Sequence, residues 1–240
     1  MGLVEIVLFG VPALVALTIS LLKWASDGRR RTALFRFAVT FGLEYTPTDP
    51  FGLIDHRFSL FDRADAARCE NVVWGTWQGV EVKVGELWFK PDPERRRQLF
   101  RTARRSSFAT VEIPAWLPKL AIRHDPLASI SETLLLDRLR FESDVFNRMY
   151  RVECEDERFA YKFVDPRMML WLQEIGQAFP FDFEVSGSKV LVWCPLLKTS
   201  RLIPLFGSAA GFVDHIPRLV WNEYGTEPAE GTPTNERSAS

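Results

Sequence analysis

The feature that most constrains this chain is an uncharged apolar run, Ile6 to Leu22, which ends at Lys23, Trp24 and arginines 29–31. As a helix the run would be about 25 Å long, because each residue adds about 1.5 Å, whereas a hydrocarbon core is about 30 Å thick. Its flanks add the missing length, and lysine and tryptophan suit the headgroup interface. We therefore expect residues 3–24 to contact the lipid bilayer as an anchor.

Two other interpretations of the run remain open. A cleaved export signal would need basic residues before the run and a small-residue cleavage site after it, and the segments "MGLVE" and "LLKWASDGRRR" provide neither. A buried core helix is rarely apolar all round in a chain of this size. Because the arginines follow the run, the positive-inside rule predicts a single-pass protein of the plasma (inner) membrane, with its N-terminus outside and its remainder in the cytoplasm.

The composition predicts a folded domain behind the anchor. Hydrophobic residues make up 47% of the chain and aromatic residues 13%, which is ample for a core. The three cysteines are widely spaced and odd in number, as expected of reduced thiols in a cytosolic compartment. We expect an anchor at residues 1–25, a domain at 26–224 and a disordered tail at 225–240, which is poor in apolar residues.

The local patterns predict an α+β fold of antiparallel sheet with packed helices. Alternating apolar residues on both sides of Gln78-Gly79 predict a hairpin, and Ser186-Gly187 marks a second one. A helix starts at Pro166, with Asp165 as its cap, and a last helix covers roughly Phe206 to Tyr224. The order of the elements also allows two sheet-plus-helix halves, residues 26–125 and 126–224.

Two stretches resemble segments of uncharacterised, membrane-anchored bacterial proteins, of actinobacterial type, that carry a domain of unknown function. The stretches are "NVVWGTWQGVEVKV" and "FESDVFNRMYRVECEDERFAYKFVDPRMMLWLQE". The resemblance covers about half of the chain, and its motifs are structural in type. It implies a membrane-tethered cytoplasmic domain and transfers no catalytic residue.

A second basic segment, "ERRRQLFRTARR", offers four interpretations: a solvated face, contact with anionic lipid headgroups, binding of nucleic acid, or binding of another acidic partner. The anchor would hold this segment near a negatively charged leaflet, where each basic residue contributes about 1 kcal/mol. Helical spacing would align its arginines on one side. We expect arginines of both basic segments to contact anionic lipid. They are Arg29, Arg30 and Arg31 after the anchor, and Arg97, Arg101, Arg104 and Arg105 in the second segment. We expect no nucleic-acid partner.

The sequence contains no recognisable catalytic, cofactor or metal motif. The histidines at 56, 124 and 215 and the cysteines at 69, 154 and 194 lack the short spacings of zinc sites. The acidic stretch "ECEDERF" lacks the glycine and spacing of a calcium loop, and no phosphate-binding loop is present. We therefore expect no cofactor and no metal.

Two functional classes remain open. The first, which we favour, is a membrane-tethered interaction or regulatory module with an unidentified protein partner. The second is an enzyme that acts on a lipid or on a membrane-delivered substrate. A deep polar pocket that brought together His124, Asp125 or Cys154 would favour the enzyme.

Overall fold

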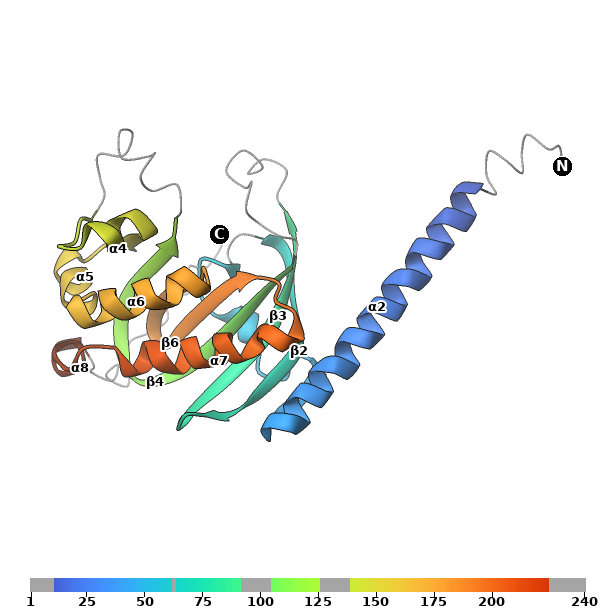
Figure 1. The fold of residues 1–240 in the computed structure, drawn as a ribbon, viewed down its shortest axis with the longest axis horizontal. Coiled ribbons are helices and arrows are strands. Elements are labelled where there is room, and N and C mark those ends of the chain that lie inside the picture. Colours follow the sequence, from blue (N-terminus) through green and yellow to red (C-terminus); the bar gives the residue numbers. More distant parts are fainter. Residues whose placement is uncertain (1–10, 62–63, 92–104, 126–138, 225–240) are drawn as a thin grey trace, which may run out of the picture.

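The computed structural model describes residues 11–61, 64–91, 105–125 and 139–224, which form one antiparallel sheet with helices packed on it (Figure 1). The strands are β1 (Glu44–Thr48), β2 (Ala64–Trp77), β3 (Val80–Pro91), β4 (Arg105–His124), β5 (Tyr150–Cys154) and β6 (Asp182–Pro195). The α-helices are α2 (Val11–Phe41), α4 (Asp144–Met149), α5 (Glu157–Phe163), α6 (Pro166–Ala178), α7 (Leu202–Asp214) and α8 (Arg218–Tyr224). Two short 3-10 helices are η2 (Leu53–Asp55) and η5 (Thr199–Arg201). The expected α+β class with antiparallel sheet is confirmed.

The long strand β4 organises the sheet. β6 pairs with β4 along most of its length, while β3 and β5 pair with opposite ends of β4, and β1 and β2 continue the sheet beyond β3. Pro114 and Pro118 lie in the stretch of β4 between the β3 and β5 pairings, where the pairing with β6 is also irregular and a residue without an N–H group is tolerated. The boundary expected between residues 125 and 126 lies between β4 and β5. These two strands pair in one sheet, so the sheet includes strands from both expected halves.

The predicted hairpin at Gln78-Gly79 is confirmed. Trp77 pairs with Val80, and the two turn residues both have positive φ, 51° for Gln78 and 81° for Gly79. Positive φ at both central positions is the requirement of the two-residue turn whose twist matches that of the strands.

The second predicted hairpin, at Ser186-Gly187, is wrong. β6 runs unbroken through this pair, and Gly187 is opposite Leu117 of β4. The glycine has a positive φ of 60°, and a Cβ there would lie 3.3 Å from the Trp116 ring. The glycine therefore serves an irregularity in the β4–β6 pairing rather than a turn between two strands.

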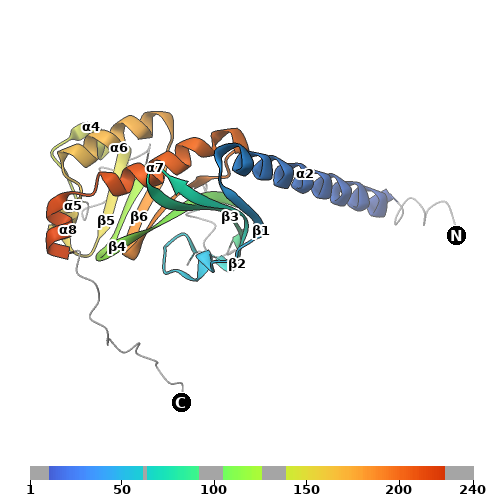
Figure 2. The ribbon, with the colours of Figure 1, turned by 90° about the horizontal axis from the view of Figure 1, so that it is seen from below.

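One face of the sheet carries the helices and most of the core. Helices α4, α6 and α7 lie on this face; α6 and α7 are in front of the sheet in Figure 1, and all three helices are above it in Figure 2. The expected helix from Phe206 to Tyr224 is two helices, because Pro217 disfavours a helical conformation at the preceding residue. The cap expected at Asp165 is confirmed, since its side chain accepts a hydrogen bond from Met168 N–H. Ser143 caps α4 in the same way, by accepting from Phe146 N–H.

The opposite face of the sheet is covered only in part. A segment at residues 49–61, with η2 in it, packs a smaller apolar cluster against this face (Figure 2). Phe58 and Phe61 of the segment meet Phe108 of β4 and Trp193 of β6 in that cluster. The β4–β5–β6 end of the same face carries charged side chains instead, and it forms the polar cleft described below.

Helix α2 is continuous across residues 25 and 26, where we expect the anchor to end and the domain to begin. Its last turns bury Leu34, Phe37 and Ala38 in the main core, and it ends at Gly42, whose φ is 66°. Leu43 N–H then donates to Ala38 O at 2.8 Å, as expected of a helix end with a left-handed glycine. Towards its N-terminus the helix projects away from the domain (Figures 1 and 2).

Among the described residues, none of the helices combines the length and apolar character that a membrane crossing requires. The first part of the expected span, residues 6–10, lies outside the described residues, as do Arg97, Arg101, Arg104 and the expected tail at 225–240. The membrane anchor therefore stays a prediction.

Candidate functional site

A polar network joins helix α2 to the sheet; we call it the helix–sheet junction. Arg30 Nε lies 2.6 Å from Glu86 Oε1 of β3, and Arg30 Nη2 donates to Leu197 O at 2.7 Å. Glu86 is buried, and its other oxygen accepts from Asn71 Nδ2 at 3.0 Å. Two donors therefore satisfy the two oxygens of this buried carboxylate, which offsets the cost of removing it from water.

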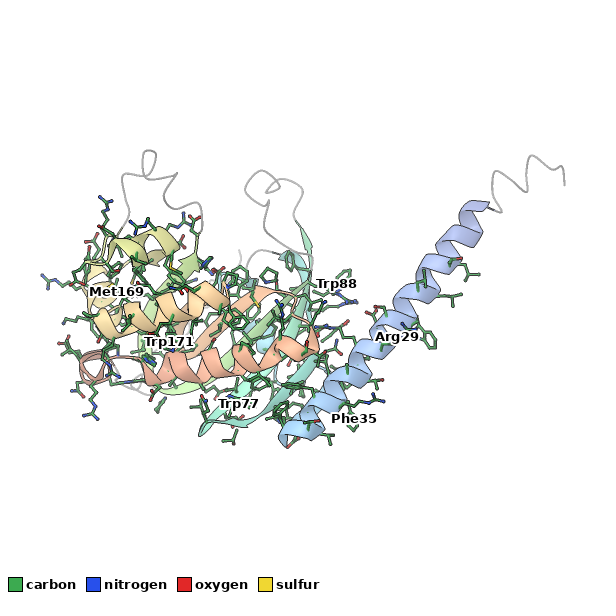
Figure 3. All side chains as sticks on the ribbon, in the orientation of Figure 1. Arg29, Phe35, Trp77, Trp88, Met169 and Trp171 are labelled. Atoms are coloured by element: carbon green, nitrogen blue, oxygen red, sulfur yellow. The ribbon has the colours of Figure 1, made fainter. Side chains whose placement is uncertain are left out.

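A second contact of the helix–sheet junction lies one turn towards the N-terminus of α2. Arg105, the first residue of β4, donates to Asp27 Oδ1 from Nη1 at 3.3 Å and from Nη2 at 3.2 Å. Its guanidinium also lies 5.7 Å from the centre of the Trp88 ring. Figure 3 shows Trp88 on the sheet and Arg29 on α2 at this junction. Two charged contacts therefore set the direction in which α2 leaves the domain.

The residues expected to contact lipid thus divide into two groups. Arg30 and Arg105 bind carboxylates of the protein, whereas Arg29 and Arg31 are exposed on α2. Arg105 begins a strand, so the expected helical alignment of the 95–105 segment does not extend to it. Arg97, Arg101 and Arg104 lie outside the described residues, and their lipid contact stays a prediction.

The projecting part of α2 carries exposed apolar side chains. The exposed fractions are 57% for Leu17, 56% for Leu21, 65% for Leu22 and 79% for Trp24. Singly exposed apolar residues are ordinary on a protein surface, but a group of four next to exposed arginines is typical of a surface that meets a membrane or another protein.

Comparison with known proteins places the fold. No protein-family model and no curated protein matches the chain. A solved structure is similar: the crystal structure of the mycobacterial trehalose monomycolate transport factor A, TtfA, with a TM-score of 0.52 and 14% identity. The match covers 79% of this chain and 96% of that chain. At this identity the likeness shows a shared fold alone.

A second surface feature is an open cleft of about 1130 Å³ on the sheet face opposite the helices; we call it the polar cleft. Its lining includes Lys119 and Arg123 of β4, Arg151 and Glu153 of β5, and Ser59 of the 49–61 segment. The acidic stretch singled out in the sequence forms one side of it. In that stretch Asp156 caps α5 by accepting a hydrogen bond from Phe159 N–H at 3.0 Å, a role that the sequence analysis missed.

The cysteines do not have the properties of nucleophiles. Cys154 lines the polar cleft, but burial raises the pKa of its thiol, which donates to Lys119 O and Asp156 O. Burial also raises the pKa of the Cys69 and Cys194 thiols. Only the thiolate is an effective nucleophile, so a raised pKa makes each of them unreactive near neutral pH.

The histidines have separate partners. His56 lies beside Lys189, where burial and the neighbouring ammonium lower its pKa; His215 stacks on Trp171, and His124 meets the edge of Tyr150. The lining of the polar cleft includes Cys154 but neither His124 nor Asp125, so the arrangement that would favour an enzyme is not formed there. Within the described ranges, no three His, Cys, Asp or Glu side chains gather as a metal-binding group.

Proposed function

We propose that this chain is a membrane-tethered, non-enzymatic module that holds its α+β domain at the inner face of the plasma membrane. The observation that carries the proposal is the double role of α2. Its C-terminal turns belong to the core, while the projecting turns expose Leu17, Leu21 and Trp24 beside exposed arginines. Because one rigid helix contains both parts, whatever holds the N-terminal part also fixes the orientation of the domain.

The shared fold supports a more specific role. The similar structure is that of a mycobacterial transport factor for trehalose monomycolate, a lipid. We infer that the present domain likewise assists lipid transport across the membrane, through contact with lipid or with a membrane-bound protein partner. In this proposal the N-terminus is outside, the domain is cytoplasmic, and Arg29 and Arg31 lie at the level of anionic headgroups.

Membrane tethering can be tested with the full chain. After alkaline carbonate extraction of host membranes, the wild-type chain should stay in the pellet, and a tag after Ser240 should be cleaved by protease only when the inner face is exposed. The double variant Leu17→Glu, Leu21→Glu should move to the soluble fraction, because charges inside a bilayer are costly.

The matched control replaces two exposed leucines of the domain, Leu170 and Leu219, by glutamate; their exposed fractions are 59% and 50%. This variant should stay in the pellet. A wild-type chain that carbonate releases, or a tag that is cleaved from the outside, would contradict the proposal. The transport role is tested separately: depletion of the chain in its host should leave a lipid accumulated on the inner side of the membrane, as measured by surface labelling of outer-leaflet lipid.

A further inference from the structure

Two arginines face each other in the polar cleft. Arg123 of β4 and Arg151 of β5 are direct cross-strand partners, and both line the cleft. Like charges directly opposite on adjacent strands destabilise a sheet unless something of opposite charge lies between or beside them. The structure therefore requires an account of what neutralises this pair.

Each arginine of the pair contacts one carboxylate, and one of these two carboxylates is shared with Lys119. Arg123 Nη2 lies 3.0 Å from Glu184 Oε2 of β6, and it also donates to Ser59 Oγ. The side chain of Glu184 is 0% exposed, and its other oxygen lies 3.4 Å from Lys119 Nζ. Arg151 Nη2 donates to Glu153, which is the next residue on the same face of β5. Each arginine thus uses one terminal nitrogen, Nη2, for its carboxylate.

The remaining donors of the two arginines are unsatisfied. The side chain of Arg123 is 9% exposed, and its Nε and Nη1 are buried without an acceptor; the same holds for Nε of Arg151. In the described parts of the chain, no acceptor forms a hydrogen bond with these three nitrogen atoms. A buried N–H group without a partner costs about 1–3 kcal/mol, so a cluster of such donors in one cleft indicates a missing acceptor.

We propose that the polar cleft binds a phosphate group, with its oxygens held between Arg123 and Arg151. The planar guanidinium fork matches phosphate oxygens, and two facing forks offer more donors than one carboxylate can use. Lys119 and the Ser59 hydroxyl line the same cleft and add a positive charge and a further polar contact. This inference does not depend on the proposed membrane tether or transport role.

The rest of the cleft defines the kind of molecule that carries the phosphate. The cleft is larger than a phosphate ion, and its other side has Glu155 and Glu157, both exposed. These carboxylates would repel additional negative charge and attract a cation. The cleft therefore fits a zwitterionic phosphoester, in which an amine follows the phosphate, better than a polyanion. Such a group occurs both in soluble phosphoesters and in lipid headgroups.

The test is calorimetric titration of the full chain, in neutral maltoside micelles, with O-phosphoethanolamine and with inorganic phosphate. We expect saturable binding of both, with O-phosphoethanolamine tighter at least threefold. Arg151→Gln should weaken both at least tenfold. Arg123→Lys keeps the positive charge beside Glu184 but removes the fork, and it should weaken both similarly. Glu157→Gln should reduce the preference for O-phosphoethanolamine over inorganic phosphate. The affinity for inorganic phosphate should stay the same or rise.

The matched control is Arg167→Gln, an exposed arginine on α6 on the helical face of the sheet, and it should bind like the wild type. Thermal melts of every variant show whether a loss of binding reflects unfolding. Absence of wild-type binding at millimolar ligand would overturn the proposal, as would binding that neither cleft variant weakens.

The source of the phosphate is decided by a further titration. Phosphatidylethanolamine added to the micelles competes with O-phosphoethanolamine if the cleft accepts a lipid headgroup, and it has no effect if the cleft takes only soluble ligands. Either result supports a phosphate site and assigns its source. The two proposals can fail separately. If the chain binds phosphate but carbonate releases it from membranes, the phosphate site is supported and only the proposed tether is contradicted.

Discussion

Arg30 and Glu86 lie 56 positions apart in the chain, yet their side chains meet with Nε 2.6 Å from Oε1. The pair connects the helix that projects from the domain to the third strand of the sheet. Because Glu86 is buried and Arg30 also holds the Leu197 carbonyl, this single contact links the helix, the sheet and the segment that precedes α7. It gives the projecting helix a fixed base.

Removal of Arg30 should destabilise the domain. Arg30→Gln leaves the buried Glu86 carboxylate with Asn71 as its remaining partner in the network, and we expect a loss of about 2–3 kcal/mol in the free energy of unfolding. The matched control Arg29→Gln changes an exposed neighbour and should stay within about 0.5 kcal/mol of the wild type. Denaturant titration followed by circular dichroism measures both. Equal midpoints for the two variants would show that the junction does not stabilise the fold.

A glycine on β3 should be intolerant of a side chain. A Cβ at Gly85 would lie 2.7 Å from Phe108 Cζ and 2.8 Å from Cys69 Sγ, both in the smaller apolar cluster. Gly85→Ala should therefore lower the free energy of unfolding by about 1–3 kcal/mol through overpacking. Gly207→Ala in α7 is the control, because nothing lies within 4 Å of its Cβ and alanine favours a helix by about 1 kcal/mol. The two substitutions should move the melting temperature in opposite directions, and a shift of the same sign would contradict this.

The cysteines predict how stability depends on alkaline pH. Burial raises the thiol pKa of Cys69 and Cys194 in the folded state, whereas a thiol in the unfolded chain has a pKa of about 8.5. Above that pH the unfolded chain loses protons that the folded chain keeps, so this contribution to stability is present below about pH 8.5 and is lost as the pH rises. The free energy of unfolding should fall between pH 8 and 10. A Cys69→Ala, Cys194→Ala variant should show a shallower decline, and an identical slope would exclude the thiols as its cause.

Exposed and paired arginines should differ in their effect on lipid contact. In bilayers that contain the full chain, the fraction of spin-labelled phosphatidylglycerol immobilised at the protein should exceed that of phosphatidylcholine. Arg29→Gln with Arg31→Gln should reduce this preference without a change in melting temperature, since each basic residue near the surface contributes about 1 kcal/mol. Arg105→Gln should preserve the preference, because Asp27 already engages that guanidinium. A preference that survives the double variant would assign the contact to other residues.

Turns and helix caps that depend on a few neighbouring residues could be predicted from the sequence. The hairpin at Gln78-Gly79 and the cap at Asp165 follow from backbone requirements within a few residues, and the structure confirms both of them. The turn expected at Gly187 failed because the same glycine also suits an irregular position in a long strand. Only the pairing of β6 with β4 distinguishes these two uses.

The candidate sites depend on pairings between distant segments. Arg123 and Arg151 belong to different strands, and neither stands in a recognisable motif, so the sequence offered no signal for the polar cleft. Arg30 and Arg105 belong to basic clusters in the sequence, which is why both were expected at lipid. Their carboxylate partners come from segments far away in the chain, and the tertiary structure alone shows that they are engaged.

By itself, therefore, the sequence determined the fold class, the turn at Gln78-Gly79, the cap at Asp165, and an apolar N-terminal run followed by arginines, because each of these follows from residue types at short spacing. The tertiary structure decided that α2 is one helix shared between the core and the projecting segment. It also decided which arginines are paired within the protein and which face outward, and it placed the guanidinium groups of Arg123 and Arg151 in one cleft. The physical reason is that charge pairing and burial are set by contacts between strands and helices that only the folded chain brings together.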